Sequence, residues 1–276
     1  MMGEMSISEL EEMARKCRIE ICKMTHRAQA GHPGGSLSEI DILCALYGRR
    51  LRVQTSNPKW EDRDRFILSK GHASPGMYAV LAEMGFISHA DLESYRVKGG
   101  VCQGHVDMKW CPGVDFSAGS LGMGLSFGMG CAVAARIDGS SRNSYVMIGD
   151  GEMQEGSIWE AAMSAVHHEL GNLKLFVDCN GIQNDDFCEV QMRMFDIPAK
   201  WSSFGWAVKV IDGHNMNEIV GAIEWMDTIS DRPAVVIANT VKGKGVSFME
   251  NNPAFHGAAP SDEQLVQALS ELGVSA

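Results

Sequence analysis

Short apolar segments alternate with helical segments along most of the chain, and this alternation is the strongest constraint on the fold. The strand-like segments cover residues 65–69, 145–149, 173–178, 207–211 and 234–240. Helical periodicity separates most of them. Strands that alternate with helices usually form a parallel sheet that helices cover on both faces. The sequence therefore predicts an α/β fold with a mostly parallel sheet flanked by helices.

Helical segments are expected at residues 6–30, 38–47, 75–84, 157–170 and 216–226, near the glycine-rich run after Leu121, and after Ser261. Two of them begin with the spacing of a capping box, at Ser6 with Glu9 and at Ser261 with Gln264. The run from Gly31 to Gly35 is expected to break the first helix. No repeat or polar linker divides the chain, so residues 1–276 are expected to form a single domain.

Charge and cysteine content narrow the class of protein. The 24 Lys and Arg residues and 35 Asp and Glu residues give a net charge of −11, which argues against nucleic acid as a partner. The eight cysteines contain no CxxC pair, and no secretory signal is visible in the acidic N-terminal segment. Reduced, mostly buried thiols in a cytoplasmic protein are expected.

One uncharged segment, Phe116–Ala135, is long enough to span a bilayer. It contains five glycines, three serines and few large aliphatic residues, which favours a buried helix packed closely against another backbone. No membrane partner is therefore expected. The small residues, including the pair Gly124 and Gly128, also suit close packing against another subunit.

Three predicted strands end in polar loops, at residues 69–72, 149–151 and 178–180. Ligands of open parallel sheets bind outside these carboxyl ends. The carboxylate of Asp150 and the amide oxygen of Asn180 suit Mg²⁺ or Ca²⁺. Gly149 and Gly151 would let the backbone approach an anion closely. The loops therefore indicate a metal ion that bridges the protein to a diphosphate.

Each residue also has a purely structural interpretation. Asp150 could cap a helix, and Asn180 could occupy a left-handed turn before Gly181. The pair, separated by one predicted helix and one predicted strand, favours the metal site over these alternatives.

The segment Gly149–Gly156 followed by Asn180 resembles the thiamin diphosphate signature. Six further blocks occur in the order typical of transketolases, and the chain is similar to the N-terminal, diphosphate-binding domain of that family from about Ala14 to Gly273. The blocks are residues 30–34, 62–69, 71–72, 104–105, 119–124 and 255–258.

This resemblance implies a role for each matching residue. The side chains of Asp150 and Asn180 and the carbonyl of Ile182 would ligate the metal, Mg²⁺ or Ca²⁺. The residues that would contact thiamin diphosphate are His72, Gly149, Gly151, Asn180 and His256, with the backbone of Gly119, Ser120 and Leu121 along the cofactor ring.

The catalytic residues that the resemblance implies are His32, His105 and His256, which would face the sugar, and Glu155, which would lie at a subunit contact near the cofactor. Imidazole suits both sugar binding and proton transfer near neutral pH. Many relatives carry Pro at the position of Ser120, so this loop is expected to be looser. The remaining histidines, His89, His167, His168 and His214, are expected to be structural or exposed.

In transketolases, the Glu that activates the cofactor lies on a second, pyrimidine-binding domain, and this sequence ends at Ala276. The resemblance implies a separate C-terminal partner subunit, in an α2β2 heterotetramer. Together the two chains would transfer a two-carbon ketol unit from a ketose (phosphate) to an aldose (phosphate), with the pentose phosphate pathway as the default setting and sulfosugars or branched sugars as alternatives.

Three other functions remain open on the sequence. The α subunit of a 2-oxo acid dehydrogenase shares the pattern of Asp150 and Asn180. A fragment of a 1-deoxyxylulose phosphate synthase and a non-catalytic regulator that binds Mg²⁺ or a nucleotide are further alternatives. The histidine set favours ketol transfer.

Overall fold

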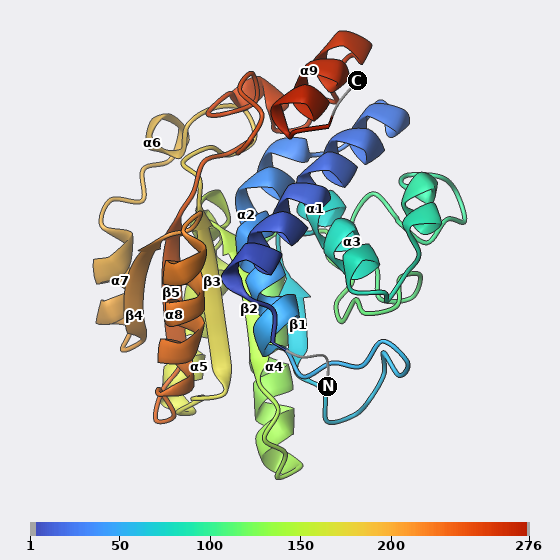
Figure 1. The fold of residues 1–276 in the computed structure, drawn as a ribbon. Coiled ribbons are helices and arrows are strands. Elements are labelled where there is room, and N and C mark those ends of the chain that lie inside the picture. Colours follow the sequence, from blue (N-terminus) through green and yellow to red (C-terminus); the bar gives the residue numbers. More distant parts are fainter. Residues whose placement is uncertain (1–3, 275–276) are drawn as a thin grey trace.

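A five-stranded parallel sheet forms the centre of the computed structural model, which describes residues 4–274 (Figure 1). Neighbouring strands follow the order β1-β2-β3-β5-β4. The strands are β1 (Arg65–Leu68), β2 (Ser144–Gly149), β3 (Leu173–Cys179), β4 (Ala207–Asp212) and β5 (Ala234–Asn239). This arrangement confirms the predicted α/β fold, and each predicted strand matches an observed one within one residue at either end.

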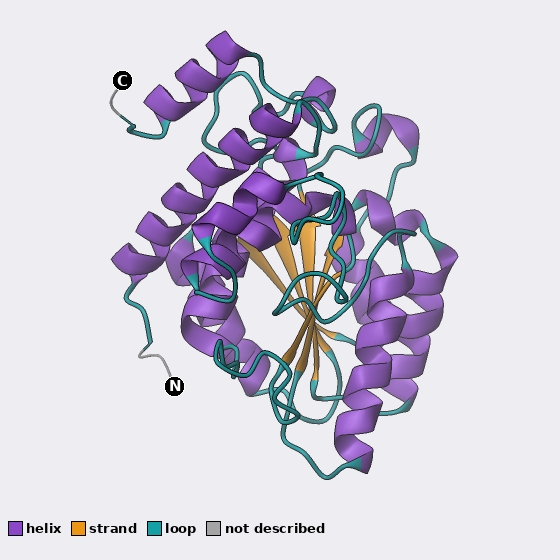
Figure 2. Cartoon of the chain, turned by 90° about the vertical axis from the view of Figure 1, so that its right-hand side faces the viewer, coloured by secondary structure: helices purple, strands orange, loops and turns teal. Residues whose placement is uncertain are grey.

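Helices cover both faces of the sheet, as Figure 2 shows. One layer contains α1 (Ile7–Ala28), α2 (Pro33–Ala45), α3 (Ser74–Glu83) and α8 (Met216–Asp227). The opposite layer contains α4 (Met123–Ile137), α5 (Gly156–His167) and α7 (Ile197–Ser203). The last helix, α9 (Asp262–Glu271), packs on α1, and α6 (Cys188–Gln191) is a single short turn.

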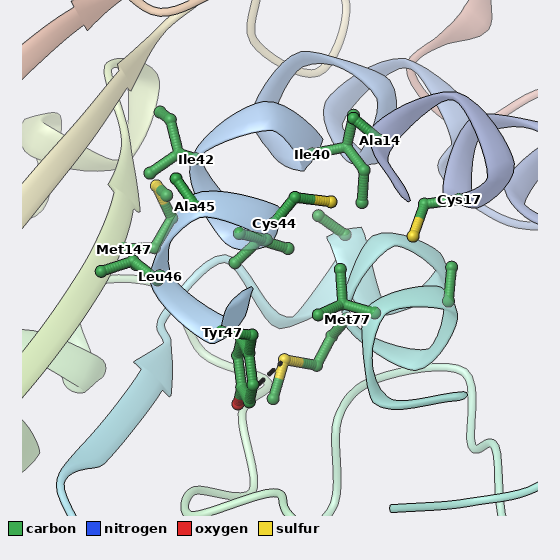
Figure 3. Close-up of a cluster of buried hydrophobic side chains, with 14 of the residues drawn as sticks. Ala14, Cys17, Ile40, Ile42, Cys44, Ala45, Leu46, Tyr47, Met77 and Met147 are labelled. Atoms are coloured by element: carbon green, nitrogen blue, oxygen red, sulfur yellow. Dashed lines mark hydrogen bonds between the residues drawn. The ribbon is translucent and has the colours of Figure 1, made fainter. Parts of the chain in front are cut away.

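The strands supply a hydrophobic core to each layer because successive side chains point to opposite faces. On β2, Tyr145 and Met147 join the core under α1, α2 and α3, whereas Val146 and Ile148 join the core under α4 and α5. Figure 3 shows part of the first core, where Tyr47 donates a hydrogen bond to the sulfur of Met77 at 3.8 Å. Nearly continuous apolar strands are typical of sheets covered on both faces.

The structure confirms both capping boxes but corrects the start of the second helix. Ser6 and Glu9 cap α1, and Ser261 and Gln264 cap α9. The break after α1 is short, because α2 begins at Pro33 rather than near residue 38. Proline suits the first helical position since it has no N–H to leave unpaired. Gly34 then fits in the first turn, where a Cβ would lie 2.8 Å from the carbonyl oxygen of Phe255.

The glycine-rich segment forms α4, which is half-buried rather than buried. A Cβ on Gly124 would strike the side chain of Ser69, and one on Gly128 would strike a methyl group of Val146. These two glycines therefore pack against the sheet of this chain, whereas Gly119 and Gly130 have open space beside them, and contact of the segment with another subunit stays a prediction. The other face of α4 exposes Met123 and Phe127.

Two further expectations can be compared with the structure. All eight cysteines are free thiols, and six of them are buried. Between residues 4 and 274, no helix is both long enough and apolar enough to cross a membrane.

Candidate functional site

Polar side chains from four loops meet at the carboxyl end of the sheet. The loops follow β1, β2, β3 and β5, which are adjacent and parallel in the sheet. They carry Lys70 and His72, Asp150, Asn180, and Lys242 respectively. The parallel strand order thus places residues that are far apart in the sequence in one region.

Asp150 joins two of these loops. One carboxylate oxygen accepts a hydrogen bond from the N–H of Gly151 at 2.9 Å, and the other accepts one from the N–H of Gly181 at 2.7 Å. Burial, together with the charge of Asp178, raises the pKa of Asp150 to about 6. A cation at this carboxylate would favour its ionised form.

The amide of Asn180 is held in one orientation by a buried carboxylate. Its nitrogen donates to Asp178 at 3.0 Å and to the hydroxyl oxygen of Ser38 at 3.2 Å. Its oxygen is left on the other side, where it accepts a hydrogen bond from the N–H of Ile182 at 3.2 Å. Asp150 and Asn180 therefore present oxygen atoms around the same Gly181 turn, and Asp150 also caps the short 3-10 turn Gly151–Gln154.

A buried charge cluster lies beneath this turn, and the sequence analysis did not identify it. The ammonium group of Lys70 lies 2.5 Å from a carboxylate oxygen of Asp178 and 2.8 Å from one of Glu39. Burial disfavours the charge on Lys70, but the two carboxylates outweigh this effect and raise its pKa. Burial raises the pKa of Glu39 to about 8. The only sequence signal was the position of Lys70 and Asp178 at strand ends.

Lys242 is a second residue that the sequence analysis missed. Its ammonium group donates to the carbonyl oxygen of Ile182 at 2.8 Å and lies 2.6 Å from Nδ1 of His256. Burial and the neighbouring charge of Lys70 lower the pKa of Lys242 to about 8. Lys242 therefore links the Asn180 turn to the histidines, and no motif in the sequence marks this contact.

The four histidines singled out in the sequence lie together. The ring centre of His32 lies 5.1 Å from that of His72, 5.4 Å from that of His256 and 6.3 Å from that of His105. A hollow of about 400 Å³ beside them is lined by His32 and His256. Nδ1 of His32 is buried without a hydrogen-bond partner in the described structure.

These histidines are neutral at neutral pH. Burial, with nearby positive groups, lowers the pKa of His32 to about 4 and that of His256 to about 3. Burial and the charge of Lys70 hold the pKa of His72 well below its usual value. Burial also lowers the pKa of His105. A neutral imidazole can donate one hydrogen bond and accept another, as sugar recognition requires.

The low histidine pKa values predict acid sensitivity. Between pH 6.5 and about 4 the unfolded chain takes up protons that the folded cluster excludes, so the histidine contribution to stability falls as the pH falls, whereas the raised pKa of Asp150 contributes in the opposite sense over the same range. We therefore expect His72→Gln to lose less melting temperature, or to gain more, than the wild-type chain as the pH is lowered over this range. His167→Gln, at an exposed position with no ion pair in the described structure, is the control. Equal slopes in all three proteins would contradict this prediction.

The remaining predicted site residues are exposed at the surface of the protein. Gly119, Ser120 and Leu121 form an exposed loop before α4. Glu155 is exposed at the start of α5, and its Cβ lies 2.7 Å from the position of a Cβ built on Gly122. The loop and Glu155 are therefore close neighbours in the fold.

The other histidines match their structural interpretation. Nδ1 of His214 lies 2.7 Å from a carboxylate oxygen of Asp41, and its Nε2 accepts a hydrogen bond from the N–H of Val241 at 2.8 Å. His89, His167 and His168 are exposed.

Comparison with known proteins identifies the family. The family described as transketolase, thiamine diphosphate binding domain, matches residues 10–276. The chain is 39% identical to the 6-deoxy-6-sulfo-D-fructose transketolase subunit SqwG of Clostridium sp. over 98% of both chains. It is 37% identical to an apulose-4-phosphate transketolase subunit of Phocaeicola vulgatus, over 97% of this chain and 95% of that one.

The solved structures agree. A transketolase from Campylobacter jejuni superposes with a TM-score of 0.92 and 32% identity, covering 98% of this chain. The chain spans only 43% of the length of that protein. Sheet order, site loops and these similarities lead to one conclusion: the chain belongs to the transketolase family and corresponds to its thiamine diphosphate binding domain.

The residues present fit a divalent cation and a diphosphate. The candidate metal ligands around Gly181 are the carboxylate of Asp150, the amide oxygen of Asn180 and the carbonyl oxygen of Ile182. All three are hard oxygen ligands. Between residues 4 and 274, no group of three His, Cys, Asp or Glu side chains could hold a metal ion. A cation here would therefore take its remaining ligands from a phosphate or from water, as Mg²⁺ commonly does.

Proposed function

We propose that this chain is the diphosphate-binding subunit of a two-chain transketolase. Folded as a single domain, it would transfer a two-carbon ketol unit from a ketose (phosphate) to an aldose (phosphate) together with a C-terminal partner subunit. The observation that carries the proposal is the meeting of four neutral histidines with the Asp150–Asn180 turn at one end of the sheet. Two relatives that match along nearly their whole length are named transketolase subunits.

Within this proposal, the oxygen donors hold the metal and the backbone holds the diphosphate. Asp150, Asn180 and the carbonyl of Ile182 would ligate Mg²⁺ or Ca²⁺. His72, Gly149 and Gly151, with Asn180, would contact the diphosphate, while the loop 119–121 would line the cofactor ring. Thiamin diphosphate, when bound, supplies the carbon nucleophile that accepts and releases the two-carbon unit.

The histidines would bind and orient the sugar. Because His32 is neutral and its Nδ1 has no partner in the described structure, it could donate to one sugar hydroxyl and accept from another, whereas His256, also neutral, has one ring nitrogen available for the sugar. Lys242 donates to Nδ1 of His256, which leaves Nε2 of that ring as the proton carrier toward the substrate. His105 is exposed at the edge of the same group and would complete it.

The partner subunit would supply the pyrimidine-binding domain and the activating Glu, in an α2β2 heterotetramer. Exposed Met123 and Phe127 on α4 and Met163 on α5 offer apolar surface for such a contact, and Glu155 lies beside α4. A cytoplasmic location, with no nucleic-acid or membrane partner, fits the net charge of −11 and the free thiols. The histidine group distinguishes this proposal from a 2-oxo acid dehydrogenase subunit.

Reconstitution tests the proposal. The chain and its partner subunit would be purified separately and assayed with Mg²⁺, thiamin diphosphate and a panel of pentose phosphates, sulfosugars and branched sugars. We expect ketol transfer from at least one ketose by the pair and none by this chain alone. Turnover by the purified single chain would refute the need for a partner, and an inactive pair on every ketose would refute transketolase activity.

A further inference from the structure

Glu152 is a buried carboxylate for which the proposed function gives no role. Its side chain is almost fully buried and contacts no cation within hydrogen-bond distance in the described structure. One oxygen accepts hydrogen bonds from the hydroxyl of Ser69 at 2.5 Å and the N–H of Gly122 at 2.8 Å. The other accepts the N–H of Gly149 at 3.2 Å.

These three donors come from three different parts of the candidate site. Gly149 ends β2 and opens the loop that would hold the diphosphate. Gly122 directly follows the loop 119–121, which would line the cofactor ring. Ser69 follows β1, and its hydroxyl oxygen in turn accepts the N–H of Gly124 at 3.0 Å. We call the loop that begins at Gly149 the first wall of the proposed cofactor site and the loop 119–121 the second wall. The side chain of Glu152 thus connects both walls.

The connection requires a hydrogen-bond acceptor at position 152, because the N-terminus of α4 presents N–H groups that need partners. The first N–H groups of a helix lack partners within the helix, and α4 has no side-chain cap of its own. Ser69 supplies one missing acceptor, for the N–H of Gly124, while Glu152 accepts the N–H of Gly122, the residue directly before α4, where a negative charge is favourable. Gly124 allows the close approach, because its α-carbon has no side chain to strike Ser69.

The second wall is held from the other side as well. The hydroxyl of Ser157, on α5, donates to the carbonyl oxygen of Gly122 at 3.1 Å. Gly122 is therefore bonded through both its N–H and its carbonyl, whereas Gly119 and Ser120 are exposed. The position of the exposed loop thus depends on the anchored residue at its end.

We propose that Glu152 is a positioning residue, which sets the loop 119–121 at a fixed distance from the diphosphate loop so that the two ends of thiamin diphosphate are bound together. This inference rests on the proposed cofactor site but goes beyond it. It assigns the alignment of the two walls to one buried carboxylate rather than to the residues that touch the cofactor. Ser69 extends the same contact to the first turn of α4.

Two variants and one control separate this role from a general effect on folding. Glu152→Gln keeps the shape of the side chain but replaces one acceptor oxygen with a donor group. Ser69→Ala leaves the carboxylate in place but removes the hydroxyl that bonds to it and that links it to Gly124. Glu160→Gln, an exposed position on α5, is the matched control.

The first measurement is amide hydrogen exchange in the full chain. We expect peptides that contain Gly122 and Gly124 to exchange at least tenfold faster in Glu152→Gln than in wild type, with β3 unchanged. Unaltered exchange at these glycines in a folded Glu152→Gln protein would overturn the proposal.

The second measurement is calorimetry on the complex with the partner subunit, with two probes in the presence of Mg²⁺. Thiamin diphosphate needs both walls, whereas inorganic pyrophosphate needs only the diphosphate loop. In both variants we expect the affinity for thiamin diphosphate to fall about tenfold or more, as for a lost hydrogen bond to a charged group. The affinity for pyrophosphate should fall less than threefold, and the control should match wild type with both probes.

The outcomes are distinct. Equal losses for the two probes would show that Glu152 only maintains the diphosphate loop or the fold, which overturns the coupling of the walls. Wild-type affinity for thiamin diphosphate in both variants would overturn it too. If the wild-type complex bound pyrophosphate but not thiamin diphosphate, the proposed function would fail as well, and that failure would be visible without any variant.

Discussion

Asp150→Ala is expected to weaken Mg²⁺-dependent binding of thiamin diphosphate by more than about 100-fold. Loss of a residue that merely supports a metal ligand already costs about 10–100-fold in affinity, and Asp150 is the only carboxylate among the proposed ligands. Its two oxygens also bond to the N–H groups of Gly151 and Gly181. The substitution would therefore remove a charge and loosen the turn that carries Asn180.

Calorimetry with Mg²⁺ and thiamin diphosphate on the reconstituted complex measures this loss. Asp150→Asn separates the two effects, because an amide oxygen can still accept one N–H while the charge is gone. Asp231→Ala, at an exposed position with no hydrogen-bonded partner in the described structure, is the control. Affinity within threefold of wild type in both Asp150 variants would contradict the metal assignment.

The meeting of distant residues at one end of the sheet was predictable from the sequence. Strands that alternate with helices are parallel, so the loops after β1, β2 and β3 had to emerge at the same edge. This is why the positions of His72, Asp150 and Asn180 in the sequence were enough to assign them to one region. The cluster of histidines from other loops required the family resemblance, since no spacing rule joins His32 to His256.

The supporting contacts could not be predicted, because they are set by packing between segments far apart in the chain. Lys70 reaches Glu39 on α2 and Asp178 on β3, and nothing local in the sequence distinguishes it from an exposed lysine. The start of α2 was misplaced for a related reason. Glycines normally disfavour helices, but a helix that is buried along its whole length accepts them where the neighbouring backbone comes close.

The role of His256 toward the sugar can be tested by substitution, and its contact with Lys242 decides which replacement is informative. Nδ1 of His256 accepts a hydrogen bond from Lys242, whose ammonium group also bonds to the carbonyl of Ile182. An alanine at this position would release Lys242 and disturb the proposed metal ligand as well. His256→Asn is preferable, because its amide oxygen can replace Nδ1 as the acceptor while Nε2 is lost.

We expect His256→Asn to bind thiamin diphosphate within threefold of wild type but to lose about 10–150-fold in kcat/KM for the ketose. That range corresponds to about 1.5–3 kcal/mol for a hydrogen bond to a charged or charge-developing group. Calorimetry and steady-state kinetics on the reconstituted pair give the two quantities, with His89→Asn as the exposed control. A kcat/KM within twofold of wild type would show that His256 does not act on the sugar, and a parallel loss of cofactor affinity would place its role at the cofactor, by direct contact or through Lys242.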